Sequence, residues 1–220
     1  MVIEMDIVEF YRTTVTGKVT NVVPRLTLAA SFFNLRGCRL IIDVGGNDGF
    51  FASLVKGVNP DIVVDSIDLG EELYPKSQSV RVNYNYDVTK PWPLTSDSYD
   101  GIHLGAIIEH VFDYKTLFDE SFRVLKPGGV LFISTPNVVC LKHRVEILFG
   151  RMPAWYVNFD HIRLWTASFL RKNLANSGFK VLNTYSVWEK NNPGLLRILT
   201  TYISSLMGSI LIAEAIKPLE

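Results

Sequence analysis

The sequence predicts an α/β fold with a doubly wound, mainly parallel sheet, and three observations carry that prediction. Short apolar runs rich in β-branched residues alternate with helical patterns along the chain. Glycine, proline or aspartate flanks these runs, which is typical of strands buried on both faces. Hydrophobic residues make up 48% of the 220 residues and charged residues 20%, as in globular proteins. Regular alternation of strands and helices favours a parallel sheet with helices on both sides.

Each expected element has a local signal. Leu117, Phe118 and Phe122 fall on one helical stripe that ends before Lys126-Pro127-Gly128, for example, which predicts a helix over 114–125. Thr166 is the expected N-cap of a later helix that ends at Ser177-Gly178. The expected strands are residues 40–44, 62–67, 80–84, 101–104, 130–134, 180–187 and 209–216. The expected helices are residues 50–56, 114–125, 138–149 and 166–176.

Charge and cysteine content exclude several classes of function. The 22 basic residues balance the 22 acidic ones, whereas a nucleic-acid-binding protein usually carries a basic excess, so we expect no nucleic-acid partner. Cys38 and Cys140 form no metal-ligand pair and suggest no disulfide scaffold. Residues 1–10 contain acids but no base, unlike a signal peptide. These features fit a cytoplasmic setting.

The uncharged stretch 198–213 is the candidate for a membrane span, and we expect no integral span there. A spanning helix needs about 20 mostly apolar residues. This stretch is shorter, and Gly208-Ser209 interrupts it. We therefore expect a helix, a turn and a buried strand, with peripheral membrane contact as a remaining possibility.

The strongest local signal is the glycine-rich turn at residues 43–49, between an expected strand and an expected helix. Ligands of open α/β sheets bind beside such turns, and Asp68, at the end of the second strand, is placed to accept hydrogen bonds from two ribose hydroxyls. The dinucleotide pattern Gly-x-Gly-x-x-Gly fails from either Gly45 or Gly46, and no Gly-Lys-Ser/Thr follows. Asp43 and Asp48 give the turn two acids and no base, which favours a cationic ligand.

Seven motifs in order then connect this turn with a known family. They are Asp43-x-Gly45-x-Asn47-x-Gly49, Asp68, Asp87, Pro91-Trp92-Pro93-Leu94, Asp97-Ser98-Tyr99-Asp100, Glu109-His110-Val111 and Leu125-Lys126-Pro127-Gly128-Gly129. Through them, residues 39–179 resemble the class I S-adenosylmethionine-dependent methyltransferases, especially the small microbial ones of the ubiquinone-methyltransferase-like type. Asn47 stands where the family has its middle glycine.

The resemblance implies a Rossmann-like sheet of seven strands in the order 3-2-1-4-5-7-6, with strand 7 antiparallel. It also implies S-adenosyl-L-methionine as the cofactor. Its amino-acid part would lie in the turn, its ribose on Asp68, its adenine on Asp87 and its ammonium group on backbone carbonyls at the end of the fourth strand. The implied cofactor-binding residues are Asp43, Gly45, Gly46, Asn47, Gly49, Asp68, Leu69, Asp87, Val88, Leu104 and Gly105.

We expect a single domain over residues 1–220, acting as a monomer or homodimer. Residues 1–38 are expected to form one or two helices that pack over the site as a lid. Residues 39–134 would form the cofactor-binding half, and residues 135–220 the substrate-side half.

Four histidines are candidates for a general base, which a hydroxyl acceptor needs because it must lose a proton. His161 lies in a segment similar to the His-x-Arg-x-Phe/Trp segment of these relatives, and His110 lies in the Glu-His motif. For His161 a loop anchor that caps the next helix is an equal alternative to catalysis, whereas for His110 a structural role comes ahead of catalysis, so the sequence favours His161. We expect His103 to be a packing residue and His143 to lie on a solvated helix face. Some relatives hold a divalent ion with an acid at the position of Ala106, so we expect no metal.

The resemblance implies a methyltransferase, and we expect methylation of oxygen on a small molecule, glycan or lipid-linked acceptor. Residues 135–156 resemble methyltransferases encoded with cell-surface polysaccharide genes. The segment contains side chains that would bind a sugar or a phosphate-linked lipid, namely Arg144, Arg151, Trp155 and Tyr156. An amphipathic cover helix is the alternative for that segment. A non-catalytic binding module on a degenerate methyltransferase fold is the alternative function, ahead of a nicotinamide oxidoreductase.

Overall fold

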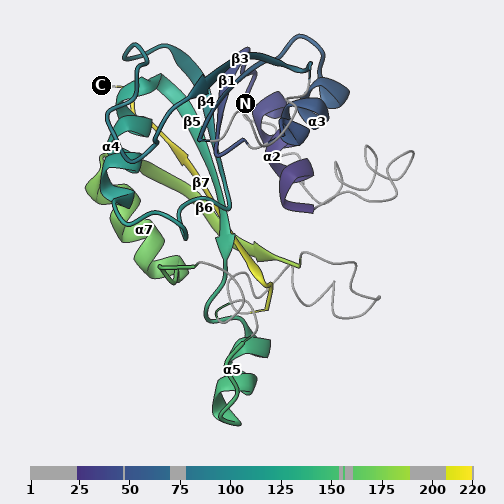
Figure 1. The fold of residues 1–220 in the computed structure, drawn as a ribbon, viewed down its shortest axis with the longest axis vertical. Helices are drawn as coiled ribbons and strands as arrows, with labels where there is room; N and C mark the ends of the chain where they lie inside the picture. The colour runs from purple at the N-terminus through teal and green to yellow at the C-terminus, as the bar shows by residue number, and fades with distance from the viewer. Residues whose placement is uncertain are drawn as a thin grey trace.

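The computed structural model describes residues 24–46, 48–69, 78–153, 156, 161–188 and 207–219. The strands are β1 (Leu40–Val44), β2 (Val63–Asp68), β3 (Val80–Asn85), β4 (Tyr99–Gly105), β5 (Leu125–Pro136), β6 (Lys180–Val187) and β7 (Ile210–Ile216). The helices are α2 (Pro24–Leu35), α3 (Phe50–Val58), α4 (Tyr114–Val124), α5 (Leu141–Leu148) and α7 (Ala167–Asn176). Figure 1 shows one sheet between two helical layers.

The sheet confirms the predicted topology. Its seven strands run in the order β3-β2-β1-β4-β5-β7-β6. The strands from β3 to β5 pair in parallel, whereas β7 is antiparallel to both of its neighbours. Parallel strands end at the same edge of the sheet, so the loops that follow β1 to β5 gather there. That edge is where ligands of doubly wound sheets bind.

Element boundaries agree closely with the sequence, and the differences have local causes. β5 runs on to Pro136 because it pairs with β7 from Val130 to Pro136. α5 begins later than expected because the side chain of Asn137 accepts a hydrogen bond from the backbone N–H of Val139, a turn that competes with helix. Thr166 caps α7 as predicted, with its side chain accepting from the N–H of Phe169.

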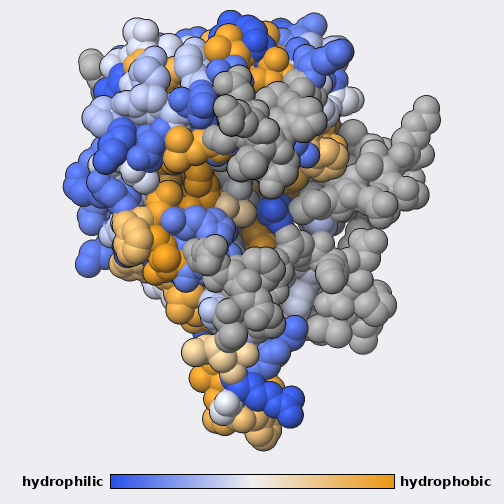
Figure 2. Space-filling model, in the orientation of Figure 1, coloured by the Kyte–Doolittle hydropathy of each residue, from blue (hydrophilic) through white to orange (hydrophobic). Residues whose placement is uncertain are grey.

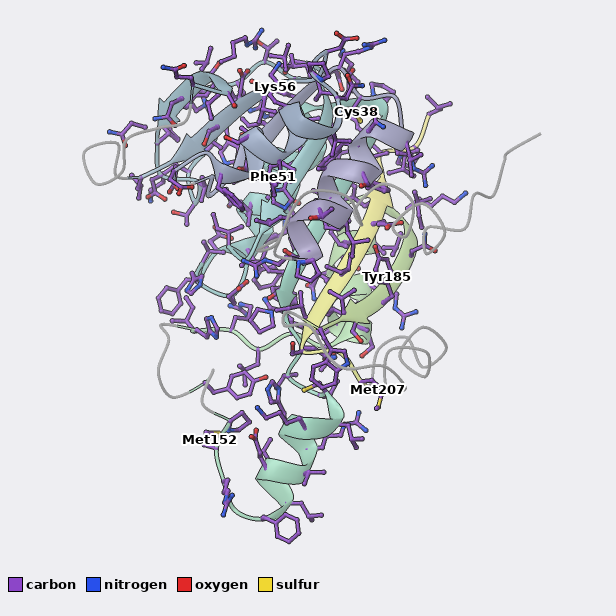
Figure 3. The ribbon with its side chains drawn as sticks, turned by 90° about the vertical axis from the view of Figure 1, so that its right-hand side faces the viewer. Cys38, Phe51, Lys56, Met152, Tyr185 and Met207 are labelled. Atoms are coloured by element: carbon purple, nitrogen blue, oxygen red, sulfur yellow. The ribbon has the colours of Figure 1, made fainter. Side chains whose placement is uncertain are left out.

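Two hydrophobic layers fill the space between sheet and helices. On one face, Phe33 of α2 packs against both Phe51 of α3 and Phe132 of β5. Figure 3 shows Phe51 on α3 beside the sheet, and its ring stacks on that of His103 with centroids 3.9 Å apart. On the other face, α4 and α7 pack around the fully buried Trp165.

The helix α2, at the end of the segment expected to form a lid, packs on the body of the domain. Ala29, Ala30 and Phe33 of this helix are completely buried, and they pack on β4, β5 and α3. One face of α2 therefore belongs to the core of the domain. The rest of the expected lid, residues 1–23, lies outside the described residues.

The stretch 198–213 ends in a buried strand, as expected. Residues Ile210–Ala215 of β7 are all buried between β5 and β6. The preceding part of the stretch, up to residue 206, lies outside the described residues. None of the helices that the structure describes has the length and apolar character needed to cross a membrane.

Candidate active site

A cavity of about 610 Å³ opens where β1 to β4 end. Its size lies within the range of small-molecule and cofactor sites, roughly 300–1,000 Å³. The described residues that line it are Gly45, Asp68, Leu69, Tyr86, Asp87, Val88, Thr89, Ala106, Ile107, His110, Val111, Phe112 and Asp113. The cavity is thus built by four successive strand ends and the loop that leads into α4.

Carboxylates dominate the charge of this cavity. Asp68, Asp87 and Asp113 line it, and the described lining contains no lysine or arginine. The hydroxyl and backbone N–H of Thr89 donate to Asp87 and lower the pKa of its carboxyl. Asp113 caps α4, and the hydroxyl and N–H of Thr116 lower the pKa of Asp113 in the same way. Both carboxylates are therefore ionised near neutral pH, and the cavity favours a cation.

Gly45 fits its place in the cavity wall only because it has no side chain. Its φ is +75°, a left-handed conformation that glycine adopts readily. A Cβ at this position would lie 2.7 Å from Cδ1 of Ile107. The N–H of Gly45 donates to the carbonyl of Ile67 at 2.9 Å, which ties the turn to β2. The missing side chain therefore lets Ile107 pack against the turn, and the backbone of Gly45 lines the cavity.

The cofactor-binding residues implied by the sequence fall into three groups. Gly45, Asp68, Leu69, Asp87 and Val88 line the cavity. Gly46 and Gly49 continue the turn after Gly45, Leu104 and Gly105 end β4 beside it, and Asp43 is buried within β1. Asn47 lies outside the described residues.

Asp43 lies beneath the turn and outside the described lining of the cavity. Only 3% of this residue is exposed, and its Oδ1 is 2.7 Å from Nδ1 of His103. His103 packs inside the sheet as expected, with 2% exposed, and it also forms this hydrogen bond. A Cβ on Gly46 would collide with Ser66 and with Oδ2 of Asp43, so the turn rests directly on these two buried side chains.

Ala106 has a strained backbone that the sequence did not reveal. Its φ is +56°, which non-glycine residues rarely adopt. The N–H of Ala106 donates to the carbonyl of Ser134 on β5 at 2.8 Å, and this bond fixes the chain as it leaves β4. The strain therefore sits in the cavity wall, where backbone outliers are often functional.

The two candidate catalytic histidines come together at this edge. The ring centroids of His110 and His161 are 4.8 Å apart, although the residues are 51 positions apart in the sequence. His110 lines the cavity and is exposed, and His161 lies beside it, half-buried. The N–H groups of Ile162 and Arg163 both donate to the carbonyl of Glu109, which holds the two segments together.

Arg163 and Trp165 anchor the segment that carries His161. The guanidinium of Arg163 lies over the ring of Tyr114 at 4.3 Å, and it donates to the carbonyl of Phe112 at 3.1 Å. The indole N–H of Trp165 donates to the carbonyl of Ile108. The His-x-Arg-x-Trp pattern therefore joins structural anchors to a histidine at the site.

Glu109 is held within the protein beside this histidine pair. Its carboxylate accepts from the hydroxyl of Thr135 at 2.9 Å, and burial raises the pKa of Glu109. Among the described residues, Glu109, His110 and His161 form the one group whose potential metal-ligand atoms all lie within 4.8 Å of one another. The expectation that the chain needs no metal therefore stays a prediction, tested below.

His143 was expected on a solvated helix face, and that expectation is wrong. Only 2% of the residue is exposed. Its Nδ1 lies 3.0 Å from the carbonyl oxygen of Asn137 and 3.2 Å from the hydroxyl of Tyr156. The neighbouring Lys142 and Arg144 are exposed as expected. His143 therefore lies on the buried face of α5. The two charged neighbours in the sequence favoured an exposed face and gave no indication of this burial.

Sequence reasoning missed several residues of the cavity wall: Tyr86, Thr89, Ile107, Phe112 and Asp113. A signal existed for Asp113, because an aspartate just before an amphipathic stripe is a common N-cap. The apolar members carry no such signal, since their position depends on how the loops after β3 and β4 fold back on the sheet.

This fold, with carboxylates and a glycine turn at the ends of its parallel strands, is that of a class I S-adenosylmethionine-dependent methyltransferase. A methyltransferase domain family matches residues 18–184, and the chain belongs to that family. The cofactor of this class is S-adenosylmethionine, and the cavity's size and negative charge fit this sulfonium nucleoside.

Known relatives agree with the family assignment. The chain is 29% identical over 151 residues to a probable S-adenosylmethionine-dependent methyltransferase of Mycolicibacterium smegmatis, covering 69% of this chain and 56% of the relative. It is 37% identical over 60 residues to human mitochondrial ubiquinone biosynthesis O-methyltransferase, covering 27% of this chain and 16% of that one. The chain thus spans little more than half of the first relative and less of the second.

The fold is shared with solved structures at low sequence identity. A Thermotoga maritima protein described as a S-adenosylmethionine-dependent methyltransferase, possible histamine N-methyltransferase, has a TM-score of 0.64 with 17% identity. That likeness covers 89% of this chain and 88% of the other, and it concerns the fold alone.

Proposed function

We propose that the chain transfers a methyl group from S-adenosylmethionine to a hydroxyl oxygen of a small molecule, glycan or lipid-linked acceptor. The observation that carries this proposal is the pair His110 and His161 at the edge of a cavity lined by carboxylates. A methyl acceptor that must lose a proton needs a base at that position. The curated relative named as an O-methyltransferase supports the choice of oxygen.

The chain's own residues would hold the cofactor in a defined direction. Asp68 would accept from the ribose hydroxyls and Asp87 would hold the adenine, since both line the cavity at the ends of neighbouring strands. The turn from Gly45 would take the amino-acid part, and the carbonyls of Leu104 and Gly105 would face its ammonium group. When bound, the sulfonium supplies a methyl group already activated for displacement, so the protein's main task is orientation.

His110 is the residue that we place in contact with the acceptor, because it lines the cavity while His161 stands behind it among the described residues. His110 would receive the proton of the acceptor hydroxyl as the oxygen attacks the methyl carbon. His161 would orient the His110 ring from 4.8 Å away, itself held through the contacts of Ile162 and Arg163 with Glu109. This order differs from the emphasis on His161 that the sequence favours.

The test is transfer of a labelled methyl group from S-adenosylmethionine to hydroxylated quinone precursors, glycans and lipid-linked sugars. We expect His110→Ala to lower kcat about 100- to 10,000-fold while the Kd of S-adenosylmethionine stays within about threefold. His161→Ala should lower kcat less and move the pH profile of kcat, whereas a purely structural role would move only stability.

His110→Gln is the matched control, because glutamine keeps a polar side chain of similar reach but cannot take a proton near neutral pH. It should be as inactive as His110→Ala. Full turnover in either His110 variant would refute the assignment of the base. Cofactor binding without transfer to any acceptor in a cell extract would instead favour the non-catalytic binding module.

A further inference from the structure

A helical arm stands out from the body of the domain. The arm, residues 141–153, consists of α5 and the turn after it, and Figures 1 and 2 show it projecting beyond the sheet. It follows β5, so it leaves the sheet at the same edge as the cavity. No residue of the arm belongs to the methyltransferase site proposed above. The role of the arm's surface is therefore a separate question.

The base of the arm is fixed to the body. His143 is buried where its ring meets the carbonyl of Asn137 and the hydroxyl of Tyr156. The side chain of Asn137 in turn donates to the carbonyl of Gly208 at 2.9 Å. These contacts engage Tyr156, so it is not a free aromatic for gripping a sugar. They also fix which face of α5 points inward.

The opposite face of α5 is apolar and exposed. Leu141, Val145 and Leu148 follow the spacing i, i+4, i+7 and form one stripe, away from His143. Leu148 is 81% exposed and Phe149, at the end of the helix, is 75% exposed. Ile147 and Met152 add further exposed apolar surface, and Figure 3 shows Met152 beside α5. Among the described residues, nothing covers this surface.

Basic residues accompany the apolar stripe. Lys142 and Arg144 flank it on α5, and Arg151 follows the helix; all three are exposed. Glu146 is the only acid between residues 141 and 153, and it lies 3.8 Å from Lys142. An exposed apolar stripe bordered by lysine and arginine is the surface of a helix that lies in the interface of an anionic membrane.

We propose that the arm docks the protein on an anionic phospholipid surface, with Leu148 and Phe149 inserted among the acyl chains. Charge favours this occupant over a second copy of the chain, because symmetric pairing would bring two basic arms together. An anionic surface instead attracts Lys142, Arg144 and Arg151, each contributing roughly a fivefold gain in partitioning. Docking would hold the cavity edge near the membrane, which suits a lipid-linked acceptor; that last step alone rests on the proposed function.

The experiment is co-sedimentation of the full chain, without any acceptor, with vesicles of known composition. One set contains phosphatidylcholine alone, and the other contains phosphatidylcholine and phosphatidylglycerol in equal parts. We expect binding to the anionic vesicles that weakens as salt is added. Leu148→Ser with Phe149→Ser should reduce the partition coefficient at least tenfold, and Arg144→Glu with Arg151→Glu should reduce it by a similar factor.

Matched controls lie elsewhere on the surface. Leu219→Ser removes an equally exposed leucine, 74% exposed, outside the arm, and Lys172→Glu reverses an exposed charge on α7. Both should bind vesicles like the unmodified chain, and all variants should keep their affinity for S-adenosylmethionine, which shows that they are folded.

Three outcomes would overturn the proposal: no binding to anionic vesicles, equal loss in the Leu219→Ser control, or dimers in gel filtration that Leu148→Ser with Phe149→Ser converts to monomers. The last result would assign the arm to self-association. Because no methyl transfer is measured, failure here leaves the proposed reaction untouched, and failure of the reaction leaves the membrane contact untouched.

Discussion

The two ends of the parallel sheet use carboxylates in opposite ways. At the end where the strands begin, Asp100 accepts hydrogen bonds from the backbone N–H groups of Arg39 and Leu40 and from the amine of Lys126. At the end where the strands finish, Asp68, Asp87 and Asp113 line a cavity whose described wall contains no lysine or arginine.

The difference shows how one residue type serves both structure and binding. Asp100 is neutralised by a cation and amides of its own chain, so it joins the starts of β1, β4 and β5. The described wall of the cavity contains three carboxylates and no lysine or arginine, so its charge favours a positively charged ligand. Removing a carboxylate should therefore cost stability at one end and affinity at the other.

Among the carboxylate substitutions, Asp68→Ala should give the largest change in affinity for S-adenosylmethionine. The ribose hydroxyls would donate hydrogen bonds to the charged carboxylate of Asp68. Loss of these bonds costs about 1.5–3 kcal/mol, which is roughly a 10- to 150-fold rise in Kd for S-adenosylmethionine. The melting temperature without ligand should change little, because Asp68 is only partly buried at the end of β2. Titration calorimetry measures the first and thermal unfolding the second; unchanged affinity would contradict the assignment of the cavity.

Asp100→Ala should show the reverse pattern. Two backbone N–H groups and Lys126 lose their acceptor, so we expect a loss of about 1–3 kcal/mol in the free energy of unfolding. The Kd of S-adenosylmethionine should stay within about twofold of the unmodified chain. Urea unfolding measures the free energy. A large loss of affinity for S-adenosylmethionine with an unchanged free energy of unfolding would contradict the proposed difference between the two ends of the sheet.

Low pH should destabilise the fold at the strand starts, because it protonates the carboxylate of Asp100. Burial alone would raise the pKa of Asp100, but the hydrogen bonds from Lys126, Leu40 and Arg39 outweigh it and lower the pKa. A lowered pKa in the folded state stabilises the fold above the unfolded pKa, near 4, and this contribution is lost as the pH falls through the folded value.

The pH dependence of unfolding checks this sign. Below about pH 4 the unmodified chain should lose stability more steeply than Asp100→Asn, which carries no titrating group at that position. Parallel stability curves for the two proteins would show that other carboxylates account for acid unfolding. Glu120, whose pKa the neighbouring Arg123 lowers, is the next candidate.

Chelation should have the smallest effect. We expect EDTA to leave turnover unchanged, because the carboxylates of the cavity would face a cationic cofactor and Glu109 is buried and bonded to Thr135. Methyl-transfer assays before and after dialysis against EDTA, with added Mg²⁺, Mn²⁺ or Zn²⁺, make the comparison. Activity lost on chelation and restored by one metal would make Glu109, His110 and His161 a metal site.

The sequence by itself determined what depends on neighbours along the chain. The spacing of hydrophobic residues and the flanking glycines predicted the exact bounds of β1 and β6. The N-cap at Thr166 predicted the start of α7. Asp68 and Gly45 could be placed at the cavity because a strand end and a turn are local features. The order of the strands followed from the motifs and the resemblance that they support.

Only the tertiary structure decided which residues meet across the chain. Three contacts depend on segments that are distant in the sequence. They are the burial of His143, the hydrogen bond between Asp43 and His103, and the approach of His110 to His161. The positive φ of Ala106 arises because β5 holds its N–H, and no property of alanine signals it. Local pattern fixes periodicity and turns, whereas the environment of a polar side chain is set by how whole elements pack.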